Sequence, residues 1–286
     1  MNSTITNALT VTNALTVDVE EYYHAIIFRE ATEGRTDGLE SRVEASIERI
    51  LALLAFHDAK ATFFILGQVA AAHPAMIRKI AGEAHEIASH GYHHQLVSRQ
   101  TPQEFRADIH DAKAVLEDIT GECVLGYRAP NFSIGHDQAW AYDILLEEGF
   151  HYDSSVYPIL HDRYGDRDSP RFPYEVRRNR HGGLVEVPIG TTRLLGVNLP
   201  IGGGGYFRLL PPALVRGGIK RVNTTEGQPI VFFFHPWELD PDQPRPSMRW
   251  RHRFRHYVGL EKEEAKLSRL LRDFRFGTIQ RIFAIP

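Results

Sequence analysis

The 286-residue sequence has a single cysteine, Cys123, so no internal disulfide can form. This composition fits a reducing compartment, and we expect Cys123 to be a small buried apolar side chain. An excess of charge is also absent, because the formal net charge is -3 at pH 7. The chain therefore has no global positive field that would attract nucleic acid or an anionic membrane, and a polyanionic partner would require a local basic patch.

Long hydrophobic runs are missing as well, since no segment approaches the roughly 18 apolar residues that a membrane-spanning helix needs. The N-terminal stretch MNSTITNALTVTNALTV lacks the basic start, the apolar run and the small-residue cleavage site of a secretory signal. We therefore expect a cytoplasmic protein without a membrane span. The hydrophobic fraction of 43% is enough for a sizeable core, in one large α/β barrel or two modest domains.

Strand patterns alternate with helix patterns along most of the chain, which indicates an α/β fold with a parallel sheet. TNALTV occurs twice in tandem, at 6–11 and 12–17, and we expect only the second copy to be the first strand. Strands are expected at 14–19, 60–66, 85–90, 124–130, 149–158, 184–190 and 229–238, and helices at 41–56, 74–84, 102–120 and 138–148. This order is compatible with an α/β barrel of roughly seven or eight units, with active-site residues at the carboxyl ends of its strands.

Two segments fall outside this alternation. PIGGGGYFRLLPP, residues 200–212, is predicted to be a flexible surface loop, or alternatively a mobile aromatic loop over a binding site. After residue 240 a proline-rich arm precedes an amphipathic helix at 260–274, which is expected to dock on the barrel. We therefore divide the chain into an N-terminal tail (1–13), a barrel (14–240) and a C-terminal arm and helix (241–286).

Carboxylates follow the first strand directly. Side chains alternate between the two faces of a strand, so Asp18 and Glu20 point to one side and Glu21 to the other. Two converging carboxylates at the end of a parallel strand indicate that one binds a metal and the other acts as a base. A solvated strand end is the alternative explanation.

Three histidines follow the strand at 85–90. His90 and His94 are four residues apart, which in a helical turn would place both imidazoles on one face, and His93 is an alternative partner. Two histidines and one carboxylate form a common catalytic zinc set. Isolated histidines are more often surface or core residues, but three within five positions favour a metal site.

Further polar residues end later strands. His235 follows the continuously apolar run IVFFF, and its position suits a proton donor that faces the same cleft; a capping or surface histidine is the alternative. Arg128 and Pro130 in GYRAPNFS, and Asp153 in YDSSVYP, lie at comparable strand ends. Each of these is weak evidence when taken alone.

In this order, the motifs resemble those of the polysaccharide deacetylases, the NodB-homology carbohydrate esterases, over about Leu15 to Trp237. VDVE matches the acidic first motif, SHGYHH the His-x-x-x-His second, RAP the third, YDSS loosely the fourth and FFFH the fifth. DVEEYYH, RAPNFSI, YDSSVYP, EVPIGTTRLLG and the segment HYVGLEKEEAKLSRLLRDFRF resemble the subgroup linked to exosortase-type exopolysaccharide loci, which has its own C-terminal extension.

The resemblance implies a distorted (β/α) barrel of about seven units with a C-terminal extension. It also implies metal-dependent removal of N-acetyl groups from the N-acetylhexosamine units of a bacterial exopolysaccharide or its precursor. It assigns Glu20, His90 and His94 as ligands of a divalent metal, most simply Zn²⁺, although Co²⁺, Mn²⁺ or Fe²⁺ suit similar ligands. Asp18 would be the base, His235 the acid, Arg128 the partner of Asp18 and Asp153 an orienting residue. The first motif departs from the family, because Glu20 stands where an aspartate is usual, so the roles of Asp18 and Glu20 are open to exchange.

Candidate sugar-binding side chains are Tyr22, Pro130, Phe132 and Trp237, for which core packing is the alternative. RPSMRWRHRFRHY is the one basic patch with interleaved aromatics; we interpret it as an arm that packs over the barrel, and we expect no nucleic-acid partner. The expected partners are an N-acetylated glycan and proteins of an exopolysaccharide pathway. The alternative functions are an amidohydrolase for a small cyclic amide, as in allantoinase-like relatives, and an inactive carbohydrate-binding barrel.

Overall fold

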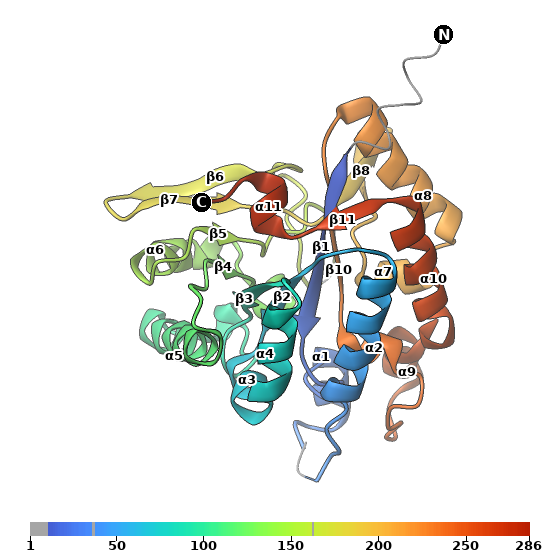
Figure 1. Cartoon of the computed structure of the whole chain (residues 1–286), viewed down its shortest axis with the longest axis horizontal. Coiled ribbons are helices and arrows are strands. Elements are labelled where there is room, and N and C mark those ends of the chain that lie inside the picture. The colour runs from blue at the N-terminus through green and yellow to red at the C-terminus, as the bar shows by residue number, and fades with distance from the viewer. Residues whose placement is uncertain (1–10, 36–37, 162) are drawn as a thin grey trace.

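The computed structural model describes residues 11–35, 38–161 and 163–286, which form an α/β structure with helices around a central sheet (Figure 1). The strands are β1 Thr12–Val19, β2 Thr62–Ile65, β3 Glu86–Ser89, β4 Gly126–Tyr127, β5 Tyr152–Asp153, β6 Tyr174–Asn179, β7 Gly182–Glu186, β8 Thr191–Leu194, β9 Val197–Pro200, β10 Val231–Phe234 and β11 Arg275–Gly277. The helices are α1 Ile26–Ala31, α2 Val43–Phe56, α3 Gly67–Ala72, α4 Pro74–Gly82, α5 Pro102–Thr120, α6 Trp140–Glu147, α7 Gly204–Leu209, α8 Pro212–Arg221, α9 Trp250–Tyr257, α10 Leu260–Asp273 and α11 Ile279–Phe283.

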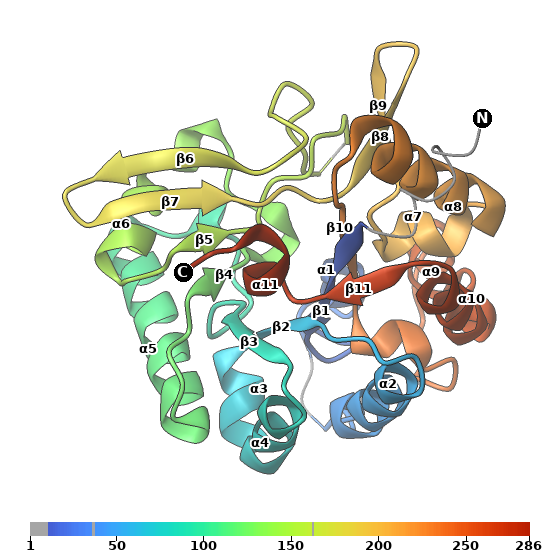
Figure 2. The same ribbon diagram turned by 45° about the horizontal axis from the view of Figure 1, so that its top comes forward.

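The main sheet has the order β10-β1-β2-β3-β4-β5-β7-β6, and β11 also pairs with β1. Neighbouring strands from β10 to β7 are parallel, as the alternating pattern predicted, whereas β6 is antiparallel to β7. Backbone hydrogen bonds from Gly190 N to Val231 O (2.9 Å) and from Phe233 N to Gly202 O (2.8 Å) connect the far side of the sheet to β10. The sheet therefore curves round on itself as a distorted barrel (Figure 2).

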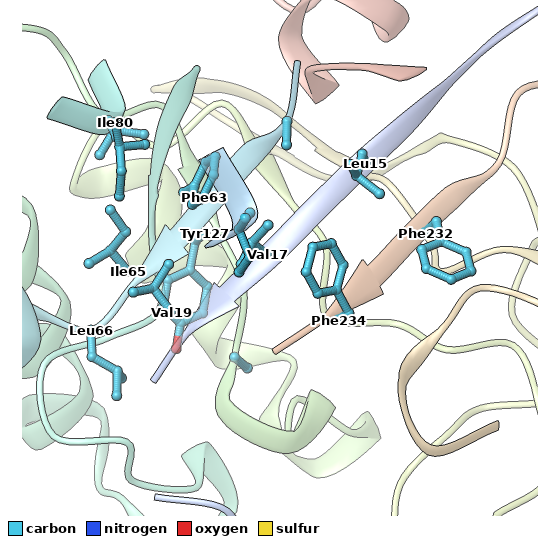
Figure 3. Close-up of a cluster of buried hydrophobic side chains, with 14 of the residues drawn as sticks. Leu15, Val17, Val19, Phe63, Ile65, Leu66, Ile80, Tyr127, Phe232 and Phe234 are labelled. Carbon is cyan, nitrogen blue, oxygen red and sulfur yellow. The ribbon is translucent and has the colours of Figure 1, made fainter. Parts of the chain in front are cut away.

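Strand alternation separates an outer core from an inner one. In β1 the side chains of Leu15, Val17 and Val19 point outward, and they pack with Phe232 and Phe234 of β10 beneath the helices (Figure 3). Inward positions of β2, β5 and β10 carry Phe64, Tyr152 and Phe233, which form a second cluster. Because Asp18 and Glu20 share the inward parity of β1, they lie at the end of the barrel interior.

Helix limits follow local signals closely where caps are strong. The longest helix, α5, has the predicted bounds: Thr101 and Glu104 form a capping box, Pro102 takes the first position, and Gly121 ends the helix in a left-handed conformation. Of the predicted division, residues 1–10 lie outside the described residues. The segment after residue 240 contributes α9, α10, α11 and strand β11, which pairs with Thr12–Ala14 of β1.

Two expectations about single segments are wrong. Cys123 is exposed, because it lies in the short connection between α5 and β4. The glycine run is not a flexible surface loop, since Gly202, Gly203 and Gly204 are buried and Gly203 bridges to Phe233 of β10. Among the described residues, no helix is long and apolar enough to cross a membrane.

Candidate metal centre and active site

The candidate site lies where inward-facing residues follow the carboxyl ends of parallel strands. Asp18 and Glu20 come from the end of β1, and His90, Arg128 and His235 directly follow β3, β4 and β10. Tyr127 and Phe234, the last residues of β4 and β10, belong to the outer core. Because side chains alternate along a strand, the next residues, Arg128 and His235, face the barrel interior. Asp18 and His235, which are more than 200 positions apart in the sequence, therefore lie at the same end of the barrel interior.

Three side chains are arranged so that they could hold a metal ion. Single ligand atoms of Glu20, His90 and His94 lie within 4.8 Å of one another, and all three residues are buried. His90 Nδ1 lies 2.8 Å from the carbonyl oxygen of Arg128, which fixes the ring and leaves Nε2 for a ligand. Buried Nδ1 of His94 has no hydrogen-bond partner among the described residues, and Nε2 of the same ring lies 2.7 Å from Oε2 of Glu20. This donor set fits a divalent ion with an open coordination position.

The electrostatics of this group also suit a metal site. Burial opposes ionisation of Glu20, but the imidazoles of His94 and His235 outweigh it and hold the pKa of this carboxyl well below its usual range. Burial lowers the pKa of His90 to about 4, so this imidazole is neutral at pH 7. A carboxylate and a neutral imidazole are the protonation states that metal binding requires.

The segment 90–94 is not the helical turn that the four-residue spacing of its histidines indicated. Gly91 and His94 both have positive φ values, of 75° and 54°, and the chain forms an irregular loop. Asp108 of α5 holds this loop, because its carboxylate accepts hydrogen bonds from the backbone N–H groups of Tyr92 (2.8 Å) and His93 (3.1 Å). The loop turns His90 and His94 toward Glu20, whereas His93 is exposed and outside the cluster.

Asp18 has different surroundings from Glu20. Its Oδ1 accepts a 2.6 Å hydrogen bond from Arg128, which is fully buried and also donates to Thr16 and to both the carbonyl and the hydroxyl of Ser154. The guanidinium lies 4.1 Å from the centroid of the Phe64 ring. A buried arginine with all these donors satisfied keeps a positive charge beside Asp18. The other carboxylate oxygen, Oδ2, lies 4.0 Å from Nε2 of His235.

His235 is held by residues of the C-terminal half. Its Nδ1 lies 3.5 Å from Oε2 of Glu238, and Glu238 in turn accepts a 2.9 Å hydrogen bond from Arg208. Burial alone would lower the pKa of His235, but the contact with Glu238 outweighs it and raises this pKa to about 9. At neutral pH the imidazole is therefore protonated, with Nε2 between Asp18 and Glu20 at 4.0 and 3.8 Å.

Asp153 does not take the orienting position beside His235. The carboxylate that contacts His235 Nδ1 is Glu238, whereas Asp153 pairs with Glu186 across β5 and β7 and accepts a hydrogen bond from Ser155. Burial raises the pKa of Asp153 to about 6 and that of Glu186 well above its usual range, so the pair retains a proton at neutral pH. The sequence could not show this pairing, because Glu186 belongs to a strand whose register is set by the fold.

The four expected sugar-binding residues have different positions. Trp237 lines a cleft of about 460 Å³ together with His235, and its indole N–H donates a 3.0 Å hydrogen bond to Glu20. Phe132 lies in the inner core against Phe233 and lines a neighbouring cavity. Tyr22 is buried in a cluster with Phe28, and Pro130 is buried at the start of a short helical turn. For Tyr22, core packing is therefore the better explanation.

Besides Glu238, two further residues near the site were missed by sequence reasoning. His24 stacks against His94 with ring centroids 6.0 Å apart, and burial lowers its pKa to about 3. Asn131 lines both the cleft and the neighbouring cavity, and its buried Nδ2 has no hydrogen-bond partner among the described residues. The signal for Asn131 was present in RAPNFS, because asparagine after a proline tolerates the left-handed φ of 53° found here.

The cleft is walled largely by the second half of the chain. Besides Glu20, Asn131 and Ile26, its lining includes Leu160, Tyr164, Tyr206, Arg208, His235 and Trp237. Aromatic faces beside polar groups suit a pyranose ring, which presents both apolar C–H surfaces and hydroxyls. Fold and site together define an α/β barrel protein with a candidate metal-binding site at the carboxyl ends of its strands.

Comparison with known proteins finds two family models that each match part of the chain. Residues 37–143 match the family model "Polysaccharide deacetylase", and residues 154–284 match a "Domain of unknown function (DUF3473)". Residues 37–143 are therefore similar to the polysaccharide deacetylases. His90, His94 and Arg128 lie within the first match, His235 and Glu238 lie within the second, and Asp18 and Glu20 precede both.

Individual relatives resemble only part of the chain. A peptidoglycan-N-acetylglucosamine deacetylase of Bacillus cereus is 34% identical over 94 residues, which are 32% of this chain and 34% of the relative. A chitooligosaccharide deacetylase of a Bradyrhizobium species is 28% identical over 96 residues, which are 34% of this chain and 42% of the relative. The chain thus aligns with less than half of either relative. A protein of Pseudomonas aeruginosa assigned as a polysaccharide deacetylase shares the fold, with a TM-score of 0.63, 16% identity and coverage of 96% of this chain and 90% of its own.

Proposed function

We propose that this protein is a metal-dependent N-deacetylase that removes acetyl groups from N-acetylhexosamine units of a glycan. The observation that carries the proposal is the arrangement of an Arg128-bound Asp18 and a protonated His235 beside the buried cluster Glu20, His90 and His94. A binding site for sugar would need neither a paired acid and base nor three converging ligand atoms. The names of the two partial relatives are consistent with this reaction.

Glu20, His90 and His94 would hold the ion, which when bound supplies Lewis acidity that polarises an amide carbonyl and lowers the pKa of water. Asp18 accepts the proton of the attacking water at Oδ2, because its Oδ1 is occupied by Arg128. Water oxygen then forms a bond to the acetyl carbon, and the carbon–nitrogen bond breaks. His235 gives its proton to the departing amine nitrogen, so the products are acetate and a free amino sugar.

The ligand and base roles follow from the partners of the two carboxylates. Glu20 lies 2.7 Å from Nε2 of His94 and is the carboxylate of the three-residue cluster. Asp18 is bound through Oδ1 to a guanidinium that cannot be deprotonated, and its Oδ2 is left to accept a proton. We therefore assign Asp18 as base and Glu20 as ligand. Zn²⁺ is the ion we expect from two imidazoles and one carboxylate.

An exopolysaccharide or its precursor is our proposed substrate, because the motif series resembles the subgroup found at exosortase-type loci. The cleft, whose lining includes Trp237, Tyr164 and Tyr206, has a volume of about 460 Å³, which is enough for at least one sugar ring. A small cyclic amide is the competing substrate class. If a glycan is the substrate, the rate should increase with the length of the glycan chain. If a small cyclic amide is the substrate, no such increase is expected.

Acetate release from N-acetylglucosamine oligomers by the zinc-loaded protein tests the proposal. We expect release from the wild type, loss of about 10³-fold or more in Asp18→Asn and His94→Ala, and an unchanged rate in His93→Ala, whose side chain is exposed in the same loop. Allantoin is the parallel probe. Release of no acetate from any oligomer, or turnover of allantoin alone, would overturn the proposal.

A further inference from the structure

A two-stranded hairpin projects from the barrel (Figure 2). It carries exposed apolar side chains. Its strands β8 and β9 pair Thr192 with Leu199 and Leu194 with Val197. Because residues two apart share a face, Leu194, Val197 and Leu199 all lie on one side of the ribbon, and Arg193 and Asn198 lie on the other. The three apolar side chains are 52%, 61% and 38% exposed.

The tip of the hairpin adds a fourth apolar residue in an unfavourable conformation. Leu195 and Gly196 form a two-residue turn with φ values of 49° and 82°, the pattern of a turn that normally takes asparagine, aspartate or glycine first. Leucine is strained in this left-handed region, and Leu195 is 96% exposed. Neither its conformation nor its exposure stabilises the folded chain, which points to a role in binding.

The chain around the hairpin is cationic. No aspartate or glutamate occurs between Glu186 and Glu226, a stretch that contains Arg193, Arg208, Arg216, Lys220 and Arg221. Arg208 and Arg216 are paired with Glu238 and Asp273. The side chains of Lys220 and Arg221 are exposed at the end of α8, and Arg193 is exposed on the hairpin.

Helix α8 lies directly against this hairpin. A methyl group built at Gly218 would come within 3.2 Å of Thr192 and 2.7 Å of Ile201, so the helix packs closely on the base of β8. Exposed Leu214, on the same helix, extends the apolar character beyond the hairpin. The β8–β9 hairpin therefore presents exposed apolar side chains beside the basic end of α8.

We propose that this hairpin docks the protein on a bilayer that contains anionic lipids. Leu194, Leu195 and Val197 would enter the interface between headgroups and acyl chains, with Lys220 and Arg221 against the anionic headgroups. A ten-residue hairpin presents far less than the roughly 800 Å² per partner of a stable protein interface, and like charges would oppose the docking of a second copy. Lys220 and Arg221 attract anionic lipids despite the net charge of -3 on the whole chain, because exposed charges that lie beyond a Debye length are screened.

Co-sedimentation with vesicles tests this proposal and does not depend on the deacetylase activity. The probes are vesicles of phosphatidylcholine alone and of phosphatidylcholine with phosphatidylglycerol. The test variant is Leu195→Asn with Val197→Thr, which suits the turn and strand conformations and so should fold. Phe56→Ser is the matched control, because Phe56 is 82% exposed at the end of α2, away from the hairpin.

We expect binding to the anionic vesicles that weakens with salt, falls about tenfold or more in the double variant and is unchanged in Phe56→Ser. Lys220→Gln with Arg221→Gln should reduce binding to anionic vesicles only. Acetate release from soluble oligomers should be the same in all these variants. Equal binding of wild type and double variant, or an elution volume that shows a dimer abolished by Leu195→Asn without vesicle binding, would overturn the proposal.

Discussion

Two carboxylates that are two residues apart on β1 acquire different chemistry from their neighbours. Asp18 is tied to Arg128, whereas Glu20 lies 2.7 Å from His94 and accepts the indole N–H of Trp237. The sequence placed both on one face of the strand, because strand parity is a local property. It could not distinguish their partners, since Arg128, His94 and Trp237 arrive from three other strand ends.

Glu238 is the residue through which the C-terminal half acts on His235. Since this carboxylate raises the pKa of His235 to about 9, Glu238→Gln should lower that pKa, and the imidazole would lose its proton at a lower pH. We expect the alkaline limb of the rate of amide hydrolysis to move to lower pH by about one unit or more. Hydrolysis of p-nitrophenyl acetate, whose leaving group needs no protonation, should change little. An unmoved alkaline limb would contradict the assignment.

Asn131 is expected to contribute a hydrogen bond to the substrate. Its Nδ2 is buried without a partner among the described residues, and it lines the cleft that contains His235. Asn131→Gly keeps the positive φ but removes the amide, so KM should increase about 5- to 10-fold with the stability unchanged. Asn131→Asp, which keeps the shape and removes the donor, should have a similar effect. Unchanged steady-state kinetics in both variants would show that the amide does not contact the substrate.

At the scale of elements, the glycine run illustrates what composition could not predict. Four consecutive glycines suggested flexibility, but Gly203 has a φ of 107° and a methyl group there would lie 1.9 Å from the carbonyl oxygen of Phe233. The glycines permit a close backbone approach that helps to close the barrel. Local sequence gives the same signal for a flexible loop and for a tight contact, and only the position of β10 separates them.

The close approach of Gly203 to β10 predicts that two glycine substitutions have opposite effects on the free energy of unfolding. Gly203→Ala should lower the free energy of unfolding by about 3 kcal/mol or more, because the backbone must move. Gly217→Ala in α8 should raise it by about 0.5–1 kcal/mol through helix propensity, because no described residue outside the local helix backbone lies within 4 Å of the added methyl group. Urea unfolding measures both. Similar effects at the two positions would contradict the close contact.

The Asp153–Glu186 pair between β5 and β7 should make stability depend on pH. Burial raises the pKa of Asp153 from 3.8 to about 6, so the folded state binds more protons than the unfolded state across that range. Stability is therefore greatest below about pH 4 for this group and decreases as pH rises through the folded pKa, by roughly 2–3 kcal/mol.

Removing one member of the pair should flatten this dependence. Glu186→Gln should be more stable than the wild type at pH 7 and lose less stability between pH 4 and pH 7. Asp137→Asn, at an exposed carboxylate, is the control. A wild-type curve that is parallel to that of Glu186→Gln would show that the two carboxyl groups do not share a proton.

At the scale of the whole molecule, the candidate site spans both family matches. Ligand and base residues come from the first half, whereas His235, its partner Glu238 and most of the cleft wall come from residues 154–284. The alternation of strands and helices predicted the α/β fold, and the spacing of polar strand ends predicted the cluster. The antiparallel β6, the hairpin and the pairing of β11 with β1 were not predicted, because short strands depend on their partners.

The metal content of the purified protein, measured alongside acetate release, tests whether Glu20, His90 and His94 hold an ion that the reaction needs. After loading with Zn²⁺ and removal of excess metal, we expect about one ion per chain in the wild type and in Asp18→Asn, but little in His94→Ala. Acetate release should be confined to the wild type. A wild type that binds no ion, or a His94→Ala variant that retains both metal and activity, would contradict the proposed metal site.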